Sequence, residues 1–258
     1  MDDMKIKVSF IIPALNEEKR IAALIDNIKM LDPDFNYEII VSDGNSTDKT
    51  SEIAEKKGAI VIKDNKGAPK TIANGRNTGA SLASGDIFIF CDADTVIKDP
   101  NTFLYEVFSV FLNPEIVGGA PSLSISPEEV ILKDKIFHSL FNRIVRLSFM
   151  TKVPICGGQC QIVRESSFRE VKGYNINIVH GEDSDFFRRL RKTGKLHFFS
   201  KLVVYESPRR YRHFGYILLL MQGVYSVVYQ QIFKKNVFKE WRRVEKERNN
   251  NRKSAFIY

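Results

Sequence analysis

Residues 88–95 read Phe88-Ile89-Phe90-Cys91-Asp92-Ala93-Asp94-Thr95, an unbroken apolar run that ends in two aspartates. A short apolar run of this kind is typical of a strand buried on both faces, as in a parallel sheet. Similar runs lie at residues 8–12, 37–41 and 59–62, and helical patterns separate them at 17–30, 47–57 and 69–84. The alternation predicts an α/β fold with a mostly parallel central sheet and flanking helices.

Polar residues follow these strands where ligands bind in parallel sheets, at the carboxyl ends. Asn16 and Glu17 follow the first strand, Asp43 follows the second, and Asp92 and Asp94 follow the fourth. Two acids in a D-x-D pattern can turn toward one hard cation, Mg²⁺ or Mn²⁺, which takes oxygen ligands and is shared with substrate phosphates. The alternative is a solvated turn with a capping aspartate, because D-x-D is short and common.

The second half of the chain is less regular. Helices are predicted at 103–112, 131–150 and 183–192, and strands at 121–125 and 196–204. The segment 181–185, Gly-Glu-Asp-Ser-Asp, opens the last helix, and a carboxylate there could take the proton from an acceptor hydroxyl. Such acids also complement a helix dipole, and Asp185 is the clearest candidate for that role.

Charge is unevenly spread along the chain. Residues 1–187 hold 21 Lys/Arg and 27 Asp/Glu, a net charge of −6, whereas residues 188–258 hold 18 and 4, a net charge of +14. A basic end of this kind suits an anionic partner: lipid head groups, nucleic acid or a diphosphate. The three cysteines form an odd, scattered set, which indicates a reducing compartment and small buried residues rather than disulfides.

Residues 214–233 carry no charge, and both flanks are basic. The length is close to what a bilayer requires, but two basic flanks do not suit a single span. An interfacial or hairpin-like helix on the inner leaflet fits better, with the helix at 131–150 on the same surface. A buried or dimer-forming helix with a solvated basic tail is the alternative.

Five segments occur in series between residues 13 and 183. They are Pro13-Ala14-Leu15-Asn16-Glu17-Glu18, Ser42-Asp43-Gly44-Asn45-Ser46-Thr47-Asp48, Gly75-Arg76-Asn77-Thr78-Gly79-Ala80, Asp92-Ala93-Asp94 and Gly181-Glu182-Asp183. In this order they resemble the family 2 glycosyltransferases, which are inverting enzymes of the GT-A fold. The resemblance covers roughly residues 5–205, and the series is far more specific than any one segment.

The resemblance implies a donor-binding set and an acceptor side. The donor-binding set is Pro13, Ala14, Asn16, Glu17, Asp43, Lys70, Arg76, Asp92, Ala93, Gly158 and Arg209. Within it, Asp43 would meet the base, and Arg76, assisted by Lys70, would contact nucleotide or phosphate. The loop at Gly157, Gly158 and Gln159 resembles the acceptor side.

The same resemblance implies the metal ligands and the base. Asp92 and Asp94 match the metal motif, with Asp94 the more direct ligand. Asp183 matches the general base, and Glu182 would orient it or the acceptor. A displacement at the anomeric carbon needs such a base on one face and a stabilised diphosphate on the other.

One departure concerns the Q-x-x-R-W motif of processive polysaccharide synthases, which is absent. Ser207-Pro208-Arg209-Arg210-Tyr211 stands in its neighbourhood, and Arg209 or Arg210 could still neutralise a diphosphate. Transfer of a single sugar is therefore the expectation.

These observations predict a glycosyltransferase domain at residues 1–206 and a basic amphipathic extension at 207–258. The expected partners are a nucleotide-sugar, a glycan or lipid-linked phosphate acceptor, and the cytoplasmic face of the cell membrane, with no nucleic acid. The alternatives are a sugar-phosphate nucleotidyltransferase, whose glycine-rich first loop is missing, and a non-catalytic module binding nucleic acid or membrane.

Overall fold

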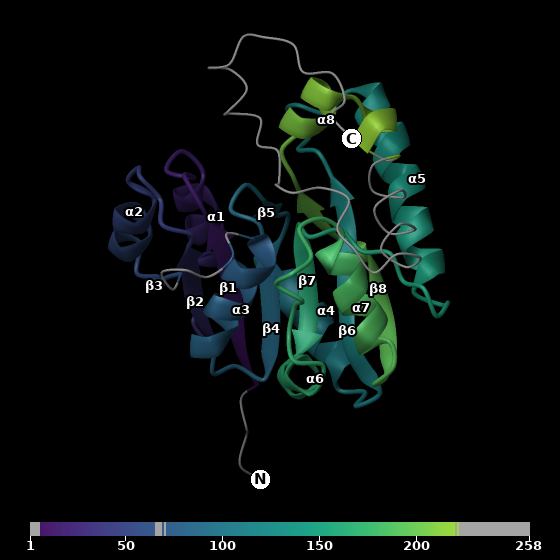
Figure 1. Ribbon diagram of the computed structural model, residues 1–258, viewed down its shortest axis with the longest axis horizontal. Coiled ribbons are helices and arrows are strands. Elements are labelled where there is room, and N and C mark those ends of the chain that lie inside the picture. The colour runs from purple at the N-terminus through teal and green to yellow at the C-terminus, as the bar shows by residue number, and fades with distance from the viewer. Residues whose placement is uncertain (1–5, 65–68, 70, 220, 222–258) are drawn as a thin grey trace.

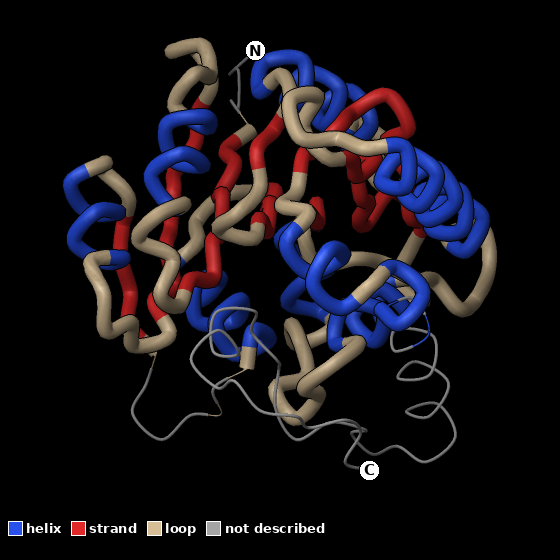
Figure 2. The backbone as a smooth tube through the Cα atoms, turned by 90° about the horizontal axis from the view of Figure 1, so that it is seen from above, coloured by secondary structure: helices blue, strands red, loops and turns tan. Residues whose placement is uncertain are grey.

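The computed structural model describes residues 6–64, 69, 71–219 and 221, and these form one eight-stranded sheet covered by helices on both faces (Figures 1 and 2). The strands are β1 (Lys7–Ala14), β2 (Asn36–Asp43), β3 (Ile60–Lys63), β4 (Ile87–Cys91), β5 (Val96–Ile97), β6 (Ile116–Ser124), β7 (Cys160–Arg164) and β8 (Lys195–Tyr205). The helices are α1 (Ile21–Ile28), α2 (Thr50–Lys56), α3 (Ile72–Leu82), α4 (Pro100–Phe111), α5 (Leu132–Ser148), α6 (Glu165–Glu170), α7 (Glu182–Leu190) and α8 (Arg209–Phe214).

The sheet has the order β3-β2-β1-β4-β7-β6-β8-β5. Its first four strands are parallel, as the alternation of apolar runs and helices predicted. β7 then runs antiparallel between β4 and β6, β8 is parallel to β6, and the short β5 closes the edge antiparallel to β8. The predicted α/β class with a mostly parallel sheet is confirmed, with antiparallel strands inserted in its second half.

Some elements are absent from the sequence-based prediction. β7 was missed because a fully buried Gln161 interrupts its apolar run, and β5 is only two residues long. The helices α6 and α8 have six residues each, too few to show a helical period. α4 begins before the predicted residue 103, because Asp99 caps it by accepting from the Thr102 N–H at 3.1 Å and Pro100 opens its first turn.

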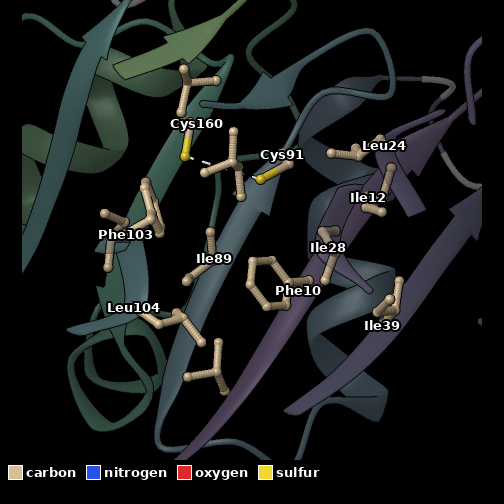
Figure 3. Close-up of a cluster of buried hydrophobic side chains, with 14 of the residues drawn as sticks. Phe10, Ile12, Leu24, Ile28, Ile39, Ile89, Cys91, Phe103, Leu104 and Cys160 are labelled. Carbon is tan, nitrogen blue, oxygen red and sulfur yellow. Dashed lines mark hydrogen bonds between the residues drawn. The ribbon is translucent and has the colours of Figure 1, made fainter. Parts of the chain in front are cut away.

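Two apolar layers hold the helices on the sheet. α1 and α4 pack against one face, and Figure 3 shows Phe10, Ile12, Leu24 and Ile28 meeting there. The four apolar residues of α1 that set its predicted period, Ile21, Leu24, Ile25 and Ile28, are all fully buried. Burial of each such side chain contributes roughly 1.5–3 kcal/mol. The cysteines Cys91, Cys156 and Cys160 are likewise buried and free, as predicted for small core residues.

On the other face, α3 lies unusually close to β1. A β carbon at Gly79 would stand 2.6 Å from Cγ2 of Ile11, and one at Gly75 would stand 3.2 Å from Cβ of Pro13. Glycine at both positions therefore lets the helix backbone rest on the strand. This contact fixes Arg76, which lies between the two glycines, at the carboxyl end of the sheet.

The predicted helix at 131–150 is α5, which stands along one flank of the molecule (Figure 1). α8 joins it through Asp134, which accepts from Arg212 at 3.2 Å and from Tyr216 at 2.6 Å. No helix of the described residues is long and apolar enough to cross a bilayer. Most of the predicted interfacial segment at 214–233 lies outside the described residues.

Candidate active site

The functional candidates from distant parts of the chain meet at one rim of the sheet. Parallel pairing sets the end of β1 beside the end of β2, with Ala14 opposite Asp43. β4 ends at Cys91, opposite the start of β7 at Cys160, so the loop before β7 adjoins Asp92. The Asp92 N–H donates to the Gln159 carbonyl at 3.1 Å, which joins the D-x-D turn to the predicted acceptor-side loop.

Arg76 is the centre of the rim. Its Nη1 donates to Asp183 at 2.6 Å and to Glu182 at 3.1 Å, and its Nη2 donates to the Gly158 carbonyl at 3.0 Å and to Asp92 at 3.3 Å. Four acceptors from three separate segments are therefore held by one guanidinium, whose planar fork suits several carboxylates at once.

Arg76, the predicted contact of nucleotide or phosphate, is buried in this structure. The side chain is 1% exposed, and its carbon Cζ lies 5.2 Å from the ring centre of Tyr174. α3 lies so close to β1 that the guanidinium points inward across the strand ends rather than outward. Arg76 therefore holds the acidic side chains in place.

Asp183, the predicted base, lies at the rim with its side chain 16% exposed. Its Oδ1 accepts from Arg76 Nη1 and from Gln161 Nε2, the latter at 3.0 Å. Gln161 is in turn fixed by the Tyr174 hydroxyl, which donates to its Oε1. Both donors reach the same oxygen, so the carboxylate is oriented with Oδ1 inward.

Gln161 and Tyr174 were not identified from the sequence. The available signal was Gln161 itself, a polar residue inside the apolar segment Cys160–Arg164, because a buried amide needs partners.

Gly158 has a steric reason to be glycine. A β carbon there would stand 2.4 Å from Arg76 Nη2 and 2.8 Å from Asp183 Oδ2. The predicted acceptor-side loop thus touches Asp183 directly, and only a residue without a side chain permits this approach.

Glu182 is 2% exposed and begins α7 beside Asp183. Its Oε1 accepts from Arg76, whereas its Oε2 is buried without a hydrogen-bond partner among the described residues. Burial, together with the neighbouring charge of Asp183, raises the pKa of Glu182 to about 8. A neutral Glu182 at physiological pH leaves Asp183 as the carboxylate of this pair that faces solvent.

Asp92 and Asp94 bring carboxylate oxygens to the rim, with side chains 26% and 25% exposed. Asp92 Oδ1 accepts from Arg76, and Asp94 Oδ2 accepts from Arg209 Nη2 at 2.7 Å. Burial raises the pKa of Asp92 to about 7, and the charges of Asp94 and Asp183 act in the same direction. Crowding of negative charge of this kind is relieved by a cation.

These two aspartates fit Mg²⁺ or Mn²⁺ by the chemistry of their oxygens. No group of three or more metal-ligating side chains occurs among the described residues. One or two carboxylates suffice for Mg²⁺, which keeps several waters and completes its shell with substrate phosphates. Arg209 would have to release Asp94 Oδ2 for that oxygen to bind a cation.

The loops after β1 and β2 are bonded to each other. Asn16 Oδ1 accepts from the Thr47 N–H at 2.9 Å, and the Glu17 N–H donates to Thr50 Oγ1 at 2.8 Å. Burial and the charge of Asp94 raise the pKa of Glu17, so this loop lies within the field of the D-x-D turn. Pro13 is half-buried, whereas Ala14 and Ala93 are buried, and Lys70 lies outside the described residues.

Asp43 is predicted to meet the base of the nucleotide, but in this structure its carboxylate is bonded within its own loop. The residue is 1% exposed, and its two oxygens accept from Ser46 and Ser51. The carboxylate therefore shapes its own loop.

Glu206 forms a second centre that was not identified from the sequence. It accepts from Gln159 Nε2 at 2.8 Å and from the Tyr211 hydroxyl at 2.8 Å, and it lies 3.0 Å from His138 Nε2. Burial lowers the pKa of His138, but the hydrogen bond and charge of Glu206 outweigh it, and the net pKa is raised. The acceptor-side loop is thereby fixed to α5 and α8.

Comparison with known proteins finds a matching family model and similar sequences. The model of glycosyl transferase family 2 matches residues 9–172, which end before Tyr174, Glu182 and Asp183. Succinoglycan biosynthesis protein ExoA of Rhizobium meliloti (strain 1021) is 24% identical over 231 residues, 80% of this chain and 66% of that protein.

Two solved structures are similar in fold. The mannosyltransferase PcManGT from Pyrobaculum calidifontis, in complex with GDP-Man and Mn²⁺, has a TM-score of 0.63 at 18% identity over 86% of this chain and 65% of that one. Glucosyl-3-phosphoglycerate synthase from Mycobacterium tuberculosis, in complex with Mn²⁺, UDP and glucosyl-3-phosphoglycerate, has a TM-score of 0.58 at 19% identity over 88% and 80%. These likenesses confirm the GT-A fold. The chain spans just under two thirds of the length of ExoA and of PcManGT.

Proposed function

This chain belongs to glycosyl transferase family 2, and from that premise we propose that it moves one sugar from a nucleotide-diphosphate sugar to an acceptor with inversion at the anomeric carbon. The observation that carries the proposal is the meeting of Asp92, Asp94 and Asp183 at one rim, where Arg76 pairs with Asp92 and Asp183 and Arg209 pairs with Asp94. One end of the rim suits a cation and a diphosphate, and the other suits a base.

On the acceptor side, Asp183 takes the proton of the attacking hydroxyl. Oδ1 is held by Arg76 and Gln161, which leaves Oδ2 as the oxygen that meets the acceptor. The same two donors fix the direction of that oxygen, so the carboxylate needs no reorganisation during the reaction. Glu182 acts indirectly, by sharing Arg76 with Asp183.

On the donor side, Asp92 and Asp94 would hold Mg²⁺ or Mn²⁺. A cation held there would neutralise charge that develops on the departing diphosphate. Arg209, released from Asp94, then contacts a phosphate with its guanidinium, a geometry that arginine favours. PcManGT was solved with GDP-Man and Mn²⁺, and the Mycobacterium tuberculosis synthase was solved with UDP and Mn²⁺, which supports this class of donor and cation.

The nucleotide lies against the ends of β1 and β2 in this proposal. One side of its binding site is formed by Pro13, Ala14, Asn16 and Glu17. The other is formed by the loop that follows β2, which Asp43 holds by hydrogen bonds. Lys70 remains a predicted phosphate contact. The similar structures carry a guanosine and a uridine nucleotide, so they support a nucleotide donor without selecting the base.

The acceptor is a glycan or a lipid-linked phosphate at the loop 157–159, beside Asp183. The domain at 1–206 performs the transfer, and the basic extension at 207–258 brings it to the cytoplasmic face of the membrane. The net charge of +14 over residues 188–258 supports that attraction to anionic lipid.

A donor panel tests the proposal. UDP- and GDP-sugars are incubated with Mn²⁺ or Mg²⁺, and released nucleoside diphosphate is measured for wild type, Asp94→Ala and Asp183→Asn. We expect cation-dependent release by wild type, loss of the cation dependence in Asp94→Ala, and a loss of transfer of roughly 10²–10⁴-fold in Asp183→Asn. Full transfer by both variants would contradict these roles, and release of pyrophosphate from a nucleoside triphosphate and a sugar phosphate would favour a nucleotidyltransferase.

A further inference from the structure

The outer face of α5 is an apolar stripe with no described partner. Leu132, Ile136, Leu140 and Leu147 are each more than half exposed, and Met150 follows the helix on the same line. At 100° per residue these five side chains share one face of the helix. An apolar face of five large side chains on the surface marks an interaction site.

Basic residues border this stripe. Lys133 lies on one edge, Lys135 and Arg146 lie on the other, and Arg143 lies within it; all four are exposed. The helix holds one acidic residue, Asp134, which is fully buried on the opposite face and bonded to Arg212 and Tyr216. The exposed side of α5 therefore combines apolar side chains with charges that are all positive.

We propose that the outer face of α5 is the surface by which this protein lies on an anionic lipid bilayer. An amphipathic helix with apolar residues on one side and lysine or arginine along its borders buries its apolar side at the level of the lipid head groups. The stems of Lys133, Lys135, Arg143 and Arg146 add to that contact while their charges meet the phosphates. Charge complementarity selects anionic lipid as the occupant.

The position of α5 connects this surface to the active site. The buried side of the helix carries His138, which contacts Glu206, and Glu206 accepts from Gln159 in the acceptor-side loop. If a bilayer lies on the outer face of α5, only this helix and Glu206 stand between the bilayer and the loop beside Asp183. The inference rests on the proposed membrane contact and adds which face and which side chains of α5 make it.

Flotation with vesicles tests the surface on the full chain. The variant Ile136→Gln/Leu140→Gln/Leu147→Gln is compared with Met30→Gln/Leu82→Gln/Leu112→Gln, which removes three exposed apolar side chains from other elements. With vesicles of phosphatidylcholine and phosphatidylglycerol, we expect the α5 variant to bind roughly tenfold or more weakly than wild type, and the control to bind within about twofold of it. Equal binding by both variants would overturn the proposal.

A dye on the stripe separates a bilayer from other occupants. An environment-sensitive fluorophore is attached at Leu140→Cys, with Leu112→Cys as control; the native cysteines are buried and react slowly. We expect a blue shift at position 140 only when anionic vesicles are added. A shift without lipid that is independent of protein concentration would mean that residues 222–258 cover the face, and one that grows with concentration would mean a second copy; either result would overturn the proposal.

Release of nucleoside diphosphate, measured on the same variants with a water-soluble acceptor, distinguishes the two proposals. Unchanged release with lost flotation supports the α5 surface. If no nucleoside diphosphate is released but the protein still floats with vesicles, the proposed transferase activity is contradicted and the proposal for the α5 surface stands.

Discussion

Two arginines beside the D-x-D turn differ in burial, and burial decides what each can do. Arg76 is 1% exposed and bonded to three carboxylates, whereas Arg209 is 28% exposed and bonded to Asp94 and to the Ser207 hydroxyl. A buried cation among carboxylates cannot leave them without a large electrostatic cost, but a partly solvated one exchanges partners readily. Arg76 is therefore structural and Arg209 is the arginine suited to phosphate.

The pair of variants Arg76→Met and Arg209→Met tests this difference. We expect Arg76→Met to lower the free energy of unfolding by about 3–5 kcal/mol, because it leaves buried carboxylates uncompensated. Arg209→Met should change stability by less than about 1 kcal/mol and should weaken nucleotide binding. Urea denaturation measures the first effect and calorimetry the second; the reverse assignment would show that Arg76 is the phosphate contact.

Gln161 and Tyr174 act as positioning residues for Asp183. Tyr174→Phe removes the donor that fixes Gln161, and Gln161→Leu removes a donor to Asp183. We expect kcat to fall roughly tenfold in Gln161→Leu and less in Tyr174→Phe, with KM for the donor nearly unchanged. A merely structural role would lower stability and leave kcat per folded molecule unaltered.

At the scale of single residues, the sequence identified the acidic side chains but not the hydrogen-bond partners that hold them in place. Asp92, Asp94 and Asp183 stand out because carboxylates after strand ends or at a helix start have a recognisable position. The partners of Asp183 could not be found in the same way. Gln161, Tyr174 and Arg76 come from a strand, a loop and a helix that are far apart in the sequence, and only the folded structure shows that their polar atoms converge.

At the scale of elements, α3 depends on two glycines. Gly79→Ala places a β carbon 2.6 Å from Ile11, so we expect a loss of about 1–3 kcal/mol of stability. Gly75→Ala, with its nearest contact at 3.2 Å, should cost less. Alanine normally stabilises a helix interior relative to glycine, so stabilisation by Gly79→Ala in urea denaturation would mean that α3 does not rest closely on β1.

The contact between α5 and α8 should depend on pH through His138. The groups facing its ring are Glu206, Tyr211 and the Asp134 carbonyl. Because the pKa of His138 is raised above 6.5 in the folded state, its stabilising effect is complete below that pH and is lost as the pH rises through the folded pKa. The melting temperature of wild type should therefore exceed that of His138→Gln most at low pH. A difference in melting temperature that stays constant as the pH rises through the pKa of His138 would contradict this role of His138.

Element prediction succeeded where the chain repeats a simple pattern. The apolar runs at 8–12, 37–41, 59–62 and 87–91 are the four parallel strands, and the helices between them lie where the spacing put them. Prediction failed at β7, whose apolar run is interrupted by the polar Gln161, and at α6 and α8, which have only six residues each. The residue that breaks the apolar pattern of β7 is therefore the one that donates to Asp183.

At the scale of the whole molecule, the fold collects charge in two places. The acids of distant segments meet at one rim around Arg76, whereas α5 presents cations around an apolar stripe on the flank. Glu206 joins the two places through His138 and Gln159. The sequence predicted the acidic end of this arrangement from strand order and placed the helix at 131–150 on the membrane-facing surface. It could not show which side chains of that helix face outward, because the orientation of a helix face depends on tertiary packing.

The most direct test of the shared acidic site is calorimetric binding of UDP and GDP with and without Mn²⁺. We expect Mn²⁺ to tighten binding of one nucleotide to wild type and to Asp183→Asn by roughly tenfold or more, and to have little effect on Asp94→Ala. Nucleotide binding that ignores Mn²⁺ in wild type, or that responds equally in Asp94→Ala, would contradict a metal–nucleotide site at the strand ends.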